Sequence, residues 1–140
     1  MTMKRESDKN TSKIILDSNA LFVPDQLKID IFEELKRLLN RKFELVLLEP
    51  VQNEMKRLAQ KGSPQMRKKA AYALTLTANC RIAKTENAVT STDEAILRFA
   101  CASGYAVFTN DKELRKKLRN INVPVIYVRQ KSHLEVDGRL

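Results

Sequence analysis

The chain has 140 residues, 43% of them hydrophobic, which suffices for one compact domain that buries about two-thirds of the surface exposed by the unfolded chain. With 26 Lys and Arg against 17 Asp and Glu, its formal net charge of +9 favours anionic partners such as nucleic acid, although a solvated basic surface explains this charge equally well. One histidine leaves little material for histidine-based catalysis. The polar N-terminus, and the lack of any apolar run of about 18 residues, argue against a signal peptide and a membrane span, so we expect a cytoplasmic protein.

The first half of the chain alternates between apolar runs and helical patterns. Residues 1–12 are polar and are expected to form a flexible extension, and residues 14–16 form the first apolar run. Apolar residues then recur at spacings of three and four, which predicts one amphipathic helix across residues 27–39. The second continuous apolar run covers residues 43–50. A strand followed by a helix and another strand is therefore the expected order.

The same alternation continues to residue 128. Proline or polar residues that suit helix starts, together with two glycines, predict helices across residues 50–62, 64–80, 92–103 and 114–118. Apolar runs predict strands across residues 81–85, 105–109 and 123–128. Ser91 with Glu94, and Asn110 with Glu113, have the spacing of a capping box. Residues 129–140 show no clear period and are expected to form a loose tail.

The pattern of elements predicts a fold class. Strands that are apolar at every position and separated by helices suit a mostly parallel sheet covered on both faces. We therefore expect a single three-layer α/β/α domain over residues 13–128, with about five strands. In such folds ligands bind at the carboxyl ends of the strands.

Acidic residues follow several of these strand ends. Asp17 directly follows the first strand, Asp111 follows the strand at 105–109, and Asp93 lies in the first turn of a helix. On a helical wheel with about 100° per residue, Glu54 borders the buried stripe of its helix. Each acid also has an ordinary explanation, as a helix cap, as a complement to a helix dipole, or, for Glu54, as a partner of Arg57.

The expected fold nevertheless brings at least the carboxylates of Asp17, Asp93 and Asp111 together. Two carboxylates about 4 Å apart repel by roughly 4 kcal/mol at an effective dielectric constant near 20. A cation offsets that repulsion, and ligands that are all oxygen suit Mg²⁺ or Mn²⁺.

Four short segments carry a family resemblance: "IILDSNAL", "EPVQNEMKRL", "STDEAIL" and "VFTNDKELRKKL". In this order, and over nearly the whole chain, they resemble the signatures of the PIN-domain nucleases. The resemblance implies a catalytic, metal-binding set made of Asp17, Glu54, Asp93 and Asp111. It also implies small polar neighbours that orient the carboxylates or water, namely Ser18, Asn19, Thr109 and Asn110, and a further candidate acid, Glu113.

The resemblance also implies an activity and partners. We expect hydrolysis of RNA phosphodiester bonds by metal-activated water, with Mg²⁺ or Mn²⁺ as the cofactor. Two roles in the family remain open: a toxin ribonuclease with a cognate antitoxin, or a nuclease that acts on a ribosomal precursor RNA. Members of the family often form homodimers.

Basic residues that would draw RNA form two groups. One covers a helix pair and contains Lys56, Arg57, Lys61, Arg67, Lys68 and Lys69. We favour the group beside Asp111, which contains Lys112, Arg115, Lys116, Lys117 and Arg119, because its helix begins at the expected site. A solvated helix face is the alternative for both groups. Tyr72, Tyr105 and Tyr127 lie in apolar contexts and are expected to be core residues rather than base-stacking residues.

Other functions of the same fold class fit less well. A receiver domain would need a pair of acids after the first strand, where Ser18 follows Asp17, and a haloacid-dehalogenase-type phosphatase would need an aspartate at Asn19. The three glycines are too scattered for a phosphate-binding loop. The remaining alternative is a non-catalytic RNA-binding or assembly module that keeps the fold, yet such a module has no need to cluster negative charge where RNA would lie.

Overall fold

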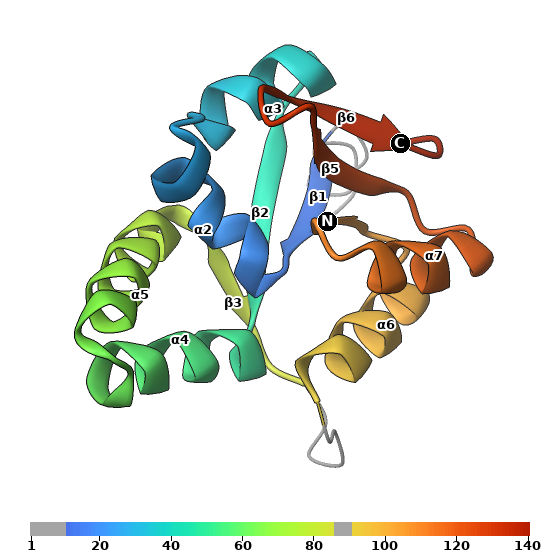
Figure 1. The fold of residues 1–140 in the computed structure, drawn as a ribbon. Helices are drawn as coiled ribbons and strands as arrows, with labels where there is room; N and C mark the ends of the chain where they lie inside the picture. Colours follow the sequence, from blue (N-terminus) through green and yellow to red (C-terminus); the bar gives the residue numbers. More distant parts are fainter. Residues whose placement is uncertain (1–10, 86–90) are drawn as a thin grey trace.

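In the computed structural model, which describes residues 11–85 and 91–140, helices cover both faces of one six-stranded sheet (Figure 1). The strands are β1 Ser12–Leu16, β2 Phe43–Leu48, β3 Arg81–Ala83, β4 Ala106–Phe108, β5 Val125–Arg129 and β6 His133–Asp137. The helices are α2 Ser18–Leu27, α3 Ile31–Leu39, α4 Glu49–Lys61, α5 Pro64–Leu76, α6 Thr92–Ser103 and α7 Lys112–Asn120. The predicted fold class, an α/β domain with a mostly parallel sheet, is confirmed.

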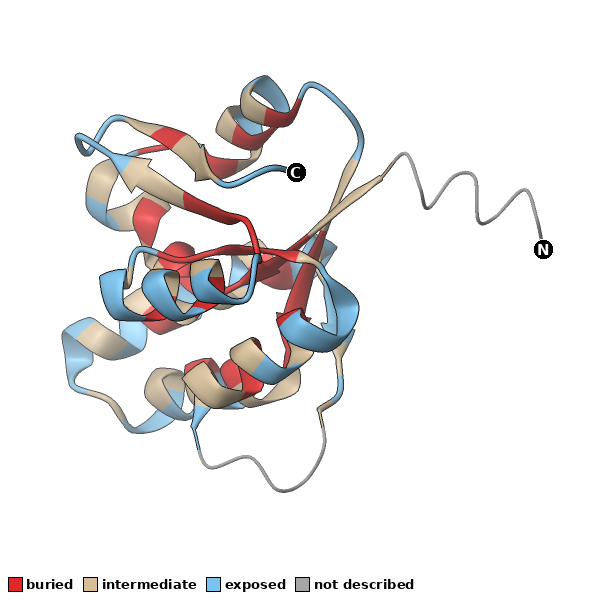
Figure 2. Cartoon of the chain, turned by 90° about the vertical axis from the view of Figure 1, so that its right-hand side faces the viewer, coloured by how far each residue is buried: buried red, intermediate tan, exposed pale blue. Residues whose placement is uncertain are grey.

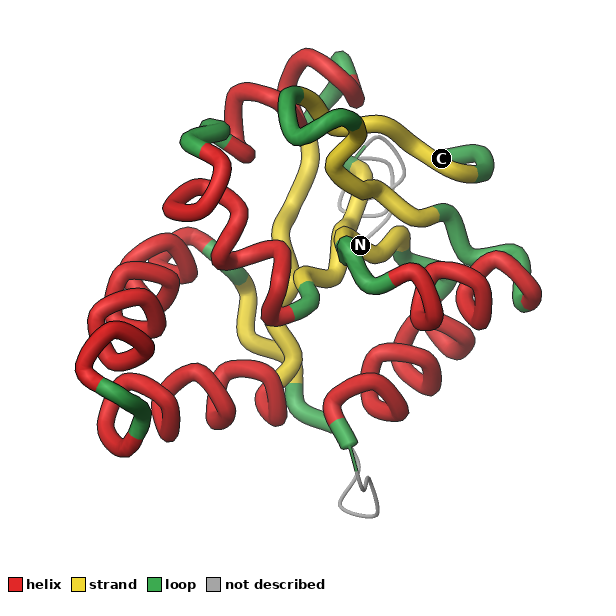
Figure 3. Tube along the Cα trace, in the orientation of Figure 1, coloured by secondary structure: helices red, strands yellow, loops and turns green. Residues whose placement is uncertain are grey.

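The strand order is β3-β2-β1-β4-β5-β6, and all neighbours are parallel except β5 and β6. In Figures 1 and 3, α2 to α5 lie on one side of the sheet and α6 and α7 on the other. No helix within the described ranges is both long enough and apolar enough to cross a lipid bilayer.

The core lies along the middle strands, which are buried on both faces (Figure 2). Ile14, Ile15 and Leu16 of β1 are at most 1% exposed, because helices cover both sides of this strand. Burial of each such side chain contributes about 1.5–3 kcal/mol relative to leaving it in water. The continuous apolar run in the sequence is therefore explained by a strand with no solvent-facing side.

The register of the sheet sets which residues meet at its carboxyl edge. Leu16 of β1 pairs with Phe108 of β4, and Phe108 also pairs with Ile126 of β5. The residues that follow these partners, Asp17 and Thr109, therefore lie side by side where the strands end.

The prediction of one helix across residues 27–39 is wrong. Helix α2 ends at Leu27, and Lys28 adopts a left-handed conformation with φ 56°. Asp30 then caps α3, since its Oδ1 accepts hydrogen bonds from the backbone N–H groups of Phe32 (3.1 Å) and Glu33 (3.2 Å). The apolar spacing continues across this break, because both helices bury one side against the same core.

The prediction of a loose tail over residues 129–140 is also wrong. Strand β6 pairs antiparallel with β5, and Gln130 and Lys131, both with positive φ (54° and 57°), make the turn between them. The N–H of Leu134 in β6 donates a hydrogen bond of 3.2 Å to the Glu34 carboxylate of α3. The C-terminal hairpin, β5 and β6, therefore belongs to the domain.

Most of the predicted boundaries agree with the structure. Ser63 caps α5 by accepting a hydrogen bond from the Met66 N–H, and Gly104, with φ 74°, ends α6. Helix α5 stops at Leu76 and continues as a 3-10 turn, Thr77–Asn79, earlier than the expected end at residue 80. Of the expected N-terminal extension, residues 1–10 lie outside the described residues, and Ser12 already belongs to β1.

Candidate active site

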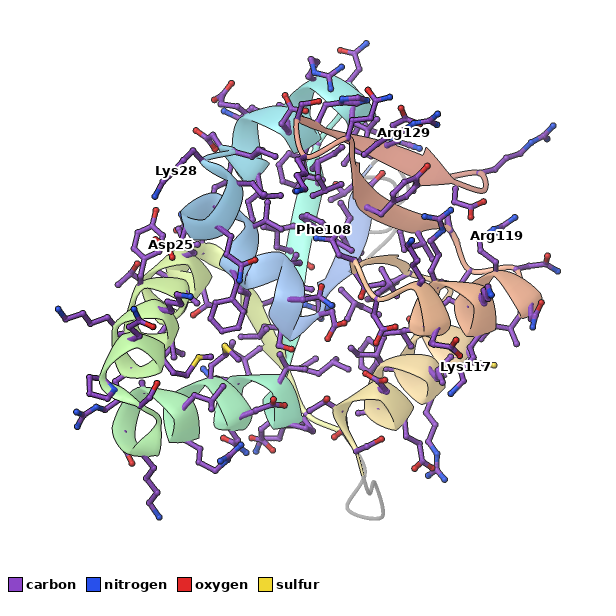
Figure 4. The ribbon with its side chains drawn as sticks, viewed as in Figure 1. Asp25, Lys28, Phe108, Lys117, Arg119 and Arg129 are labelled. Carbon is purple, nitrogen blue, oxygen red and sulfur yellow. The ribbon has the colours of Figure 1, made fainter. Side chains whose placement is uncertain are left out.

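Asp17 is held between a strand end and a helix start. It is 3% exposed, and its N–H donates a hydrogen bond of 3.0 Å to the carbonyl of the buried Phe108, labelled near the centre of Figure 4. Its Oδ1 accepts a hydrogen bond of 2.7 Å from the Ser18 N–H, so that it caps α2. The helix-cap explanation is thus correct in geometry, with the helix starting at Ser18, but it does not account for the burial of the whole carboxylate.

A network of small polar side chains surrounds the other oxygen of Asp17. The hydroxyl of Thr109, which is 0% exposed, donates a hydrogen bond of 2.6 Å to Asp17 Oδ2. The side-chain amide of Asn19 donates to the same oxygen at 3.2 Å, while Asn19 Oδ1 accepts from the Asn110 N–H at 3.0 Å. These contacts join the loop after β4 to the start of α2 and fix the orientation of the carboxylate.

Asp111 caps α7, and Asn110 has another role. Asp111 Oδ1 accepts from the N–H groups of Glu113 (2.9 Å) and Leu114 (3.2 Å), and its own N–H donates to the Thr109 hydroxyl at 3.1 Å. Asn110 Oδ1 accepts from the Val128 N–H at 2.9 Å, so the predicted capping by Asn110 is wrong. Its side chain bonds to β5 instead, a tertiary contact that local spacing cannot reveal.

The surroundings of Asp17 disfavour its negative charge. Burial raises the pKa of the Asp17 carboxyl above its ordinary value, and the hydrogen bonds from Thr109 and from the Ser18 N–H lower it again in part. The negative charges of Asp93 and Asp111 raise it further. Asp93 and Asp111 are thus the two predicted acids whose charges act on Asp17.

The remaining acids lie around this centre. Asp93 is half-buried in the first turn of α6, which Ser91 caps by accepting from the Glu94 N–H at 3.1 Å. Glu54 is half-buried on α4, a helix that contacts α6, and the ion pair with Arg57, the alternative explanation for this acid, is not formed among the described residues. Glu113 is exposed on α7. In the described part of the chain, Glu113 contacts this site only through the hydrogen bond that its backbone N–H donates to Asp111.

The chemical type of the donor atoms suits a hard divalent cation. Its candidate donors, the carboxylates of Asp17, Asp93 and Asp111, are all oxygen, and a bound cation would relieve the unfavourable ionisation of Asp17. Across residues 11–85 and 91–140, however, no three His, Cys, Asp or Glu side chains group closely enough to hold a metal ion. Mg²⁺ commonly binds through one or two carboxylates and keeps several waters, so metal binding by these acids stays a prediction.

The favoured basic residues on α7 divide into two kinds. Arg115 and Arg119 form ion pairs with the two oxygens of Asp137 in β6, at 3.2 and 3.1 Å, whereas Lys112 and Lys116 are exposed. Two of the five favoured basic side chains, Arg115 and Arg119, therefore also fasten α7 to the C-terminal hairpin. Asp137 could not be found from the sequence, because it lay in the expected tail.

Two further side chains, at the carboxyl end of β5, were not predicted as site residues from the sequence. Tyr127 is half-buried rather than a full core residue, and the guanidinium of Arg115 lies 4.0 Å from the centre of its ring. Arg129, the last residue of β5, is exposed on the C-terminal hairpin (Figure 4). The rule that selected Asp17, a charged residue where an apolar strand ends, applies equally to Arg129 and would have found it.

Comparisons with known proteins agree with this architecture. A family model described as a PIN like domain matches residues 14–131. Ribonuclease VapC4 from Methanocaldococcus jannaschii is 38% identical over 127 residues, which cover 90% of this chain and 97% of that protein.

Two solved structures share the fold. The PIN domain endonuclease Utp24 is similar with a TM-score of 0.77 and 25% identity, over 91% of this chain and 92% of that one. VapBC2 from Rickettsia felis, in a structure bound to a DNA fragment from its promoter, is similar with a TM-score of 0.59 and 14% identity, over 83% of this chain and 97% of that one. From the family model and the curated relative, the chain belongs to the PIN-domain nuclease family, as its four sequence motifs predicted.

Proposed function

We propose that this protein is a ribonuclease that hydrolyses RNA phosphodiester bonds with the help of Mg²⁺ or Mn²⁺. The observation that carries the proposal is the Asp17 carboxylate, which is buried, is oriented by Thr109 and Asn19, and is subject to the negative charges of Asp93 and Asp111. A folded chain gains no stability from a buried charge near two like charges. Such an arrangement is typical of a functional site.

Each side chain has a distinct part in the proposed reaction. Asp17, Asp93 and Asp111 would hold the cation, with Glu54 as a fourth acid from α4. When bound, the cation lowers the pKa of an attacking water and stabilises the charge on the phosphate. Thr109 and Asn19 keep Asp17 in one orientation, and the loss of such supporting groups typically costs about 10- to 100-fold in metal affinity or activity.

The test is cleavage of a labelled single-stranded RNA by the purified protein with Mg²⁺, with Mn²⁺ or with EDTA. Asp17→Asn removes the charge and keeps the shape, and we expect it to lower the cleavage rate by more than about 100-fold, beyond the loss typical of supporting groups. Asp25→Asn is the matched control, because Asp25 lies on the same helix α2 but on the opposite side of the molecule from α7 (Figure 4). It should cleave RNA like the parent protein.

All three proteins are prepared in the same way, so a contaminating nuclease would cleave RNA in the Asp17→Asn sample as well. Cleavage that persists equally in Asp17→Asn, or that EDTA does not inhibit, would contradict the proposal. Parent protein and Asp17→Asn that both bind RNA without cleaving it would instead support the non-catalytic module.

The relative Ribonuclease VapC4 favours the toxin role over ribosomal RNA processing, because it is 38% identical to this chain, whereas Utp24 is 25% identical over a similar length. On this proposal the partner is a cognate antitoxin protein encoded by a neighbouring gene. Co-purification with the neighbouring gene product, together with inhibition of RNA cleavage in the complex, would support this role. Selective cleavage of a ribosomal precursor RNA that the neighbouring protein does not inhibit would support the processing role.

A further inference from the structure

A recess in the surface adjoins the acid centre at the carboxyl edge of the sheet. This recess, the α7–β5 groove, has a volume of about 360 Å³ and lies between the start of α7 and the end of β5. Thr109 and Asn110 line it, so it begins at the residues that support Asp17 and Asp111. A chain-like ligand could therefore occupy the groove and reach the acids at the same time.

The charge of the groove is opposite to that of the acid centre. Its lining includes three cationic side chains, Lys112, Arg115 and Arg129, and no carboxylate. Among the described residues Lys112 forms no ion pair, and it is exposed. The groove therefore suits a ligand that carries negative charge next to the acid centre.

One wall of the groove is a stacked pair of flat groups. The Arg115 guanidinium lies over the Tyr127 ring at 4.0 Å, and Arg115 Nε donates a hydrogen bond of 3.2 Å to Asp137 Oδ2. A guanidinium and an aromatic ring are both surfaces against which a nucleic-acid base can pack. Because Asp137 already fixes the guanidinium, a ligand need not order it on binding.

Other lining residues of the groove are also held in place before any ligand binds. Arg129 pairs with Glu135 at 3.2 Å, and the Asn110 side chain accepts from the Val128 N–H at 2.9 Å, which fastens the end of β5 to the loop before α7. A preformed recess loses less conformational entropy when it binds a ligand than a flexible one does.

We infer that the α7–β5 groove binds the nucleotide next to the cleaved phosphodiester of a single-stranded RNA, with Lys112 and Arg129 at its phosphate and the Arg115–Tyr127 pair against its base. This inference rests on the proposed function for the identity of the ligand. It makes Lys112, Arg115, Tyr127 and Arg129 binding residues for the substrate, whereas the acids remain the reactive centre.

The experiment measures the binding of a fluorescent single-stranded RNA in EDTA, where the proposed cleavage is switched off. We expect Lys112→Ala to weaken binding by about 10-fold and to reduce the slope of log affinity against log salt by about 1, as for one lost phosphate contact. Lys42→Ala removes the same charge at an exposed position directly before β2, which does not line the groove and belongs to neither basic group expected to draw RNA, and it should change the affinity by less than about 2-fold. Equal weakening by both variants would overturn the inference, since net charge alone would explain the binding.

The base-packing wall has its own test. We expect Tyr127→Leu, checked for folding by its melting temperature, to weaken RNA binding by about 5- to 100-fold, as for one lost stacking contact. An abasic RNA of the same length should bind the parent protein more weakly than normal RNA, and this difference should shrink in Tyr127→Leu. If the parent protein binds abasic and normal RNA equally, or if millimolar inorganic phosphate displaces the RNA, the groove is a simple anion site and the inference fails.

These outcomes are separate from the test of the proposed function. If the protein cleaves RNA but Lys112→Ala and Lys42→Ala bind RNA equally well, the proposed function stands and the inference about the groove fails. A protein that never cleaves RNA but shows the expected binding differences keeps the groove and loses the function.

Discussion

The acid centre around Asp17 and the C-terminal hairpin around Asp137 both fix an aspartate, but in opposite environments. Asp17 is 3% exposed and is held by neutral donors, a hydroxyl, an amide and a backbone N–H, while two further carboxylates lie nearby. The Asp137 side chain is 36% exposed and is neutralised by two arginines. The surroundings of Asp17 disfavour its ionisation, whereas those of Asp137 stabilise it. We therefore assign the proposed reaction to Asp17 and a structural role to Asp137.

The largest effect on stability is expected from breaking the neutral network. Thr109→Val keeps the shape of the side chain but leaves Asp17 Oδ2 without its shortest hydrogen bond and the Asp111 N–H without its acceptor. We expect the free energy of unfolding, measured in urea, to fall by about 1–3 kcal/mol.

Thr75→Val is the control for this prediction. The hydroxyl of Thr75 bonds back to the Tyr72 carbonyl on the exposed side of α5, and its loss should cost less than about 0.5 kcal/mol. If the two variants lose equal stability, the network around Asp17 supports the fold no more than an ordinary surface hydroxyl does.

The second prediction tests the charge at Asp17 directly. Because the folded state raises the pKa of this carboxyl above 3.8, its ionisation opposes folding: the cost is absent below pH 3.8 and grows as the pH rises through the folded-state pKa. In EDTA, Asp17→Asn should therefore raise the melting temperature at pH 7, by about 3 °C for each kcal/mol of relieved cost. Near pH 4 the gain should nearly vanish.

Thermal unfolding of the parent protein, Asp17→Asn and Asp25→Asn between about pH 4 and pH 8 checks this behaviour. Adding Mn²⁺ at pH 7 should stabilise the parent protein and Asp25→Asn but not Asp17→Asn. An Asp17→Asn protein that melts below the parent at every pH would show that Asp17 serves mainly as a cap for α2.

The smallest effect is expected at the hairpin. Asp137→Asn releases Arg115 and Arg119, whose side chains are 33% exposed, so solvent already screens both ion pairs. We expect a loss of about 0.5–1 kcal/mol in the free energy of unfolding. The loss should shrink further in 1 M salt, where the screening length is about 3 Å. A loss that is larger than that of Thr109→Val, or independent of salt, would reverse the comparison between the two regions.

The sequence predicts the parts of the fold that depend on local pattern. Continuous apolar runs such as residues 14–16 indicate strands covered on both faces, and Ser63 with Pro64 indicates a helix start; both agree with the structure. The break at Lys28 was missed because a residue other than glycine takes the left-handed conformation there. Strand β6 was missed because its buried residue, Leu134, has too few apolar neighbours to make a visible run.

The site shows the same division. The positions of Asp17 and Asp111 follow from strand ends, and their proximity follows from the parallel register, so the sequence and one fold rule suffice. The bond from the Val128 N–H to Asn110 and the pairing of Arg115 with Asp137 join segments whose alignment depends on how the hairpin packs. The charges along α7 can be read from the sequence, but the sequence could not show which of these basic side chains are already paired within the fold.

The bond between Thr109 and Asp17 joins residues 92 positions apart in the chain. At a synthesis rate of 5–20 residues per second, a ribosome that has just added Asp17 needs about 5–20 s more to reach Thr109. Strand β1 thus leaves the ribosome long before β4, the neighbour whose following loop holds the carboxylate in place. A nascent or truncated chain that ends before residue 109 contains Asp17 but lacks the hydroxyl that orients its carboxylate. The acid centre can therefore form only when most of the domain has been synthesised.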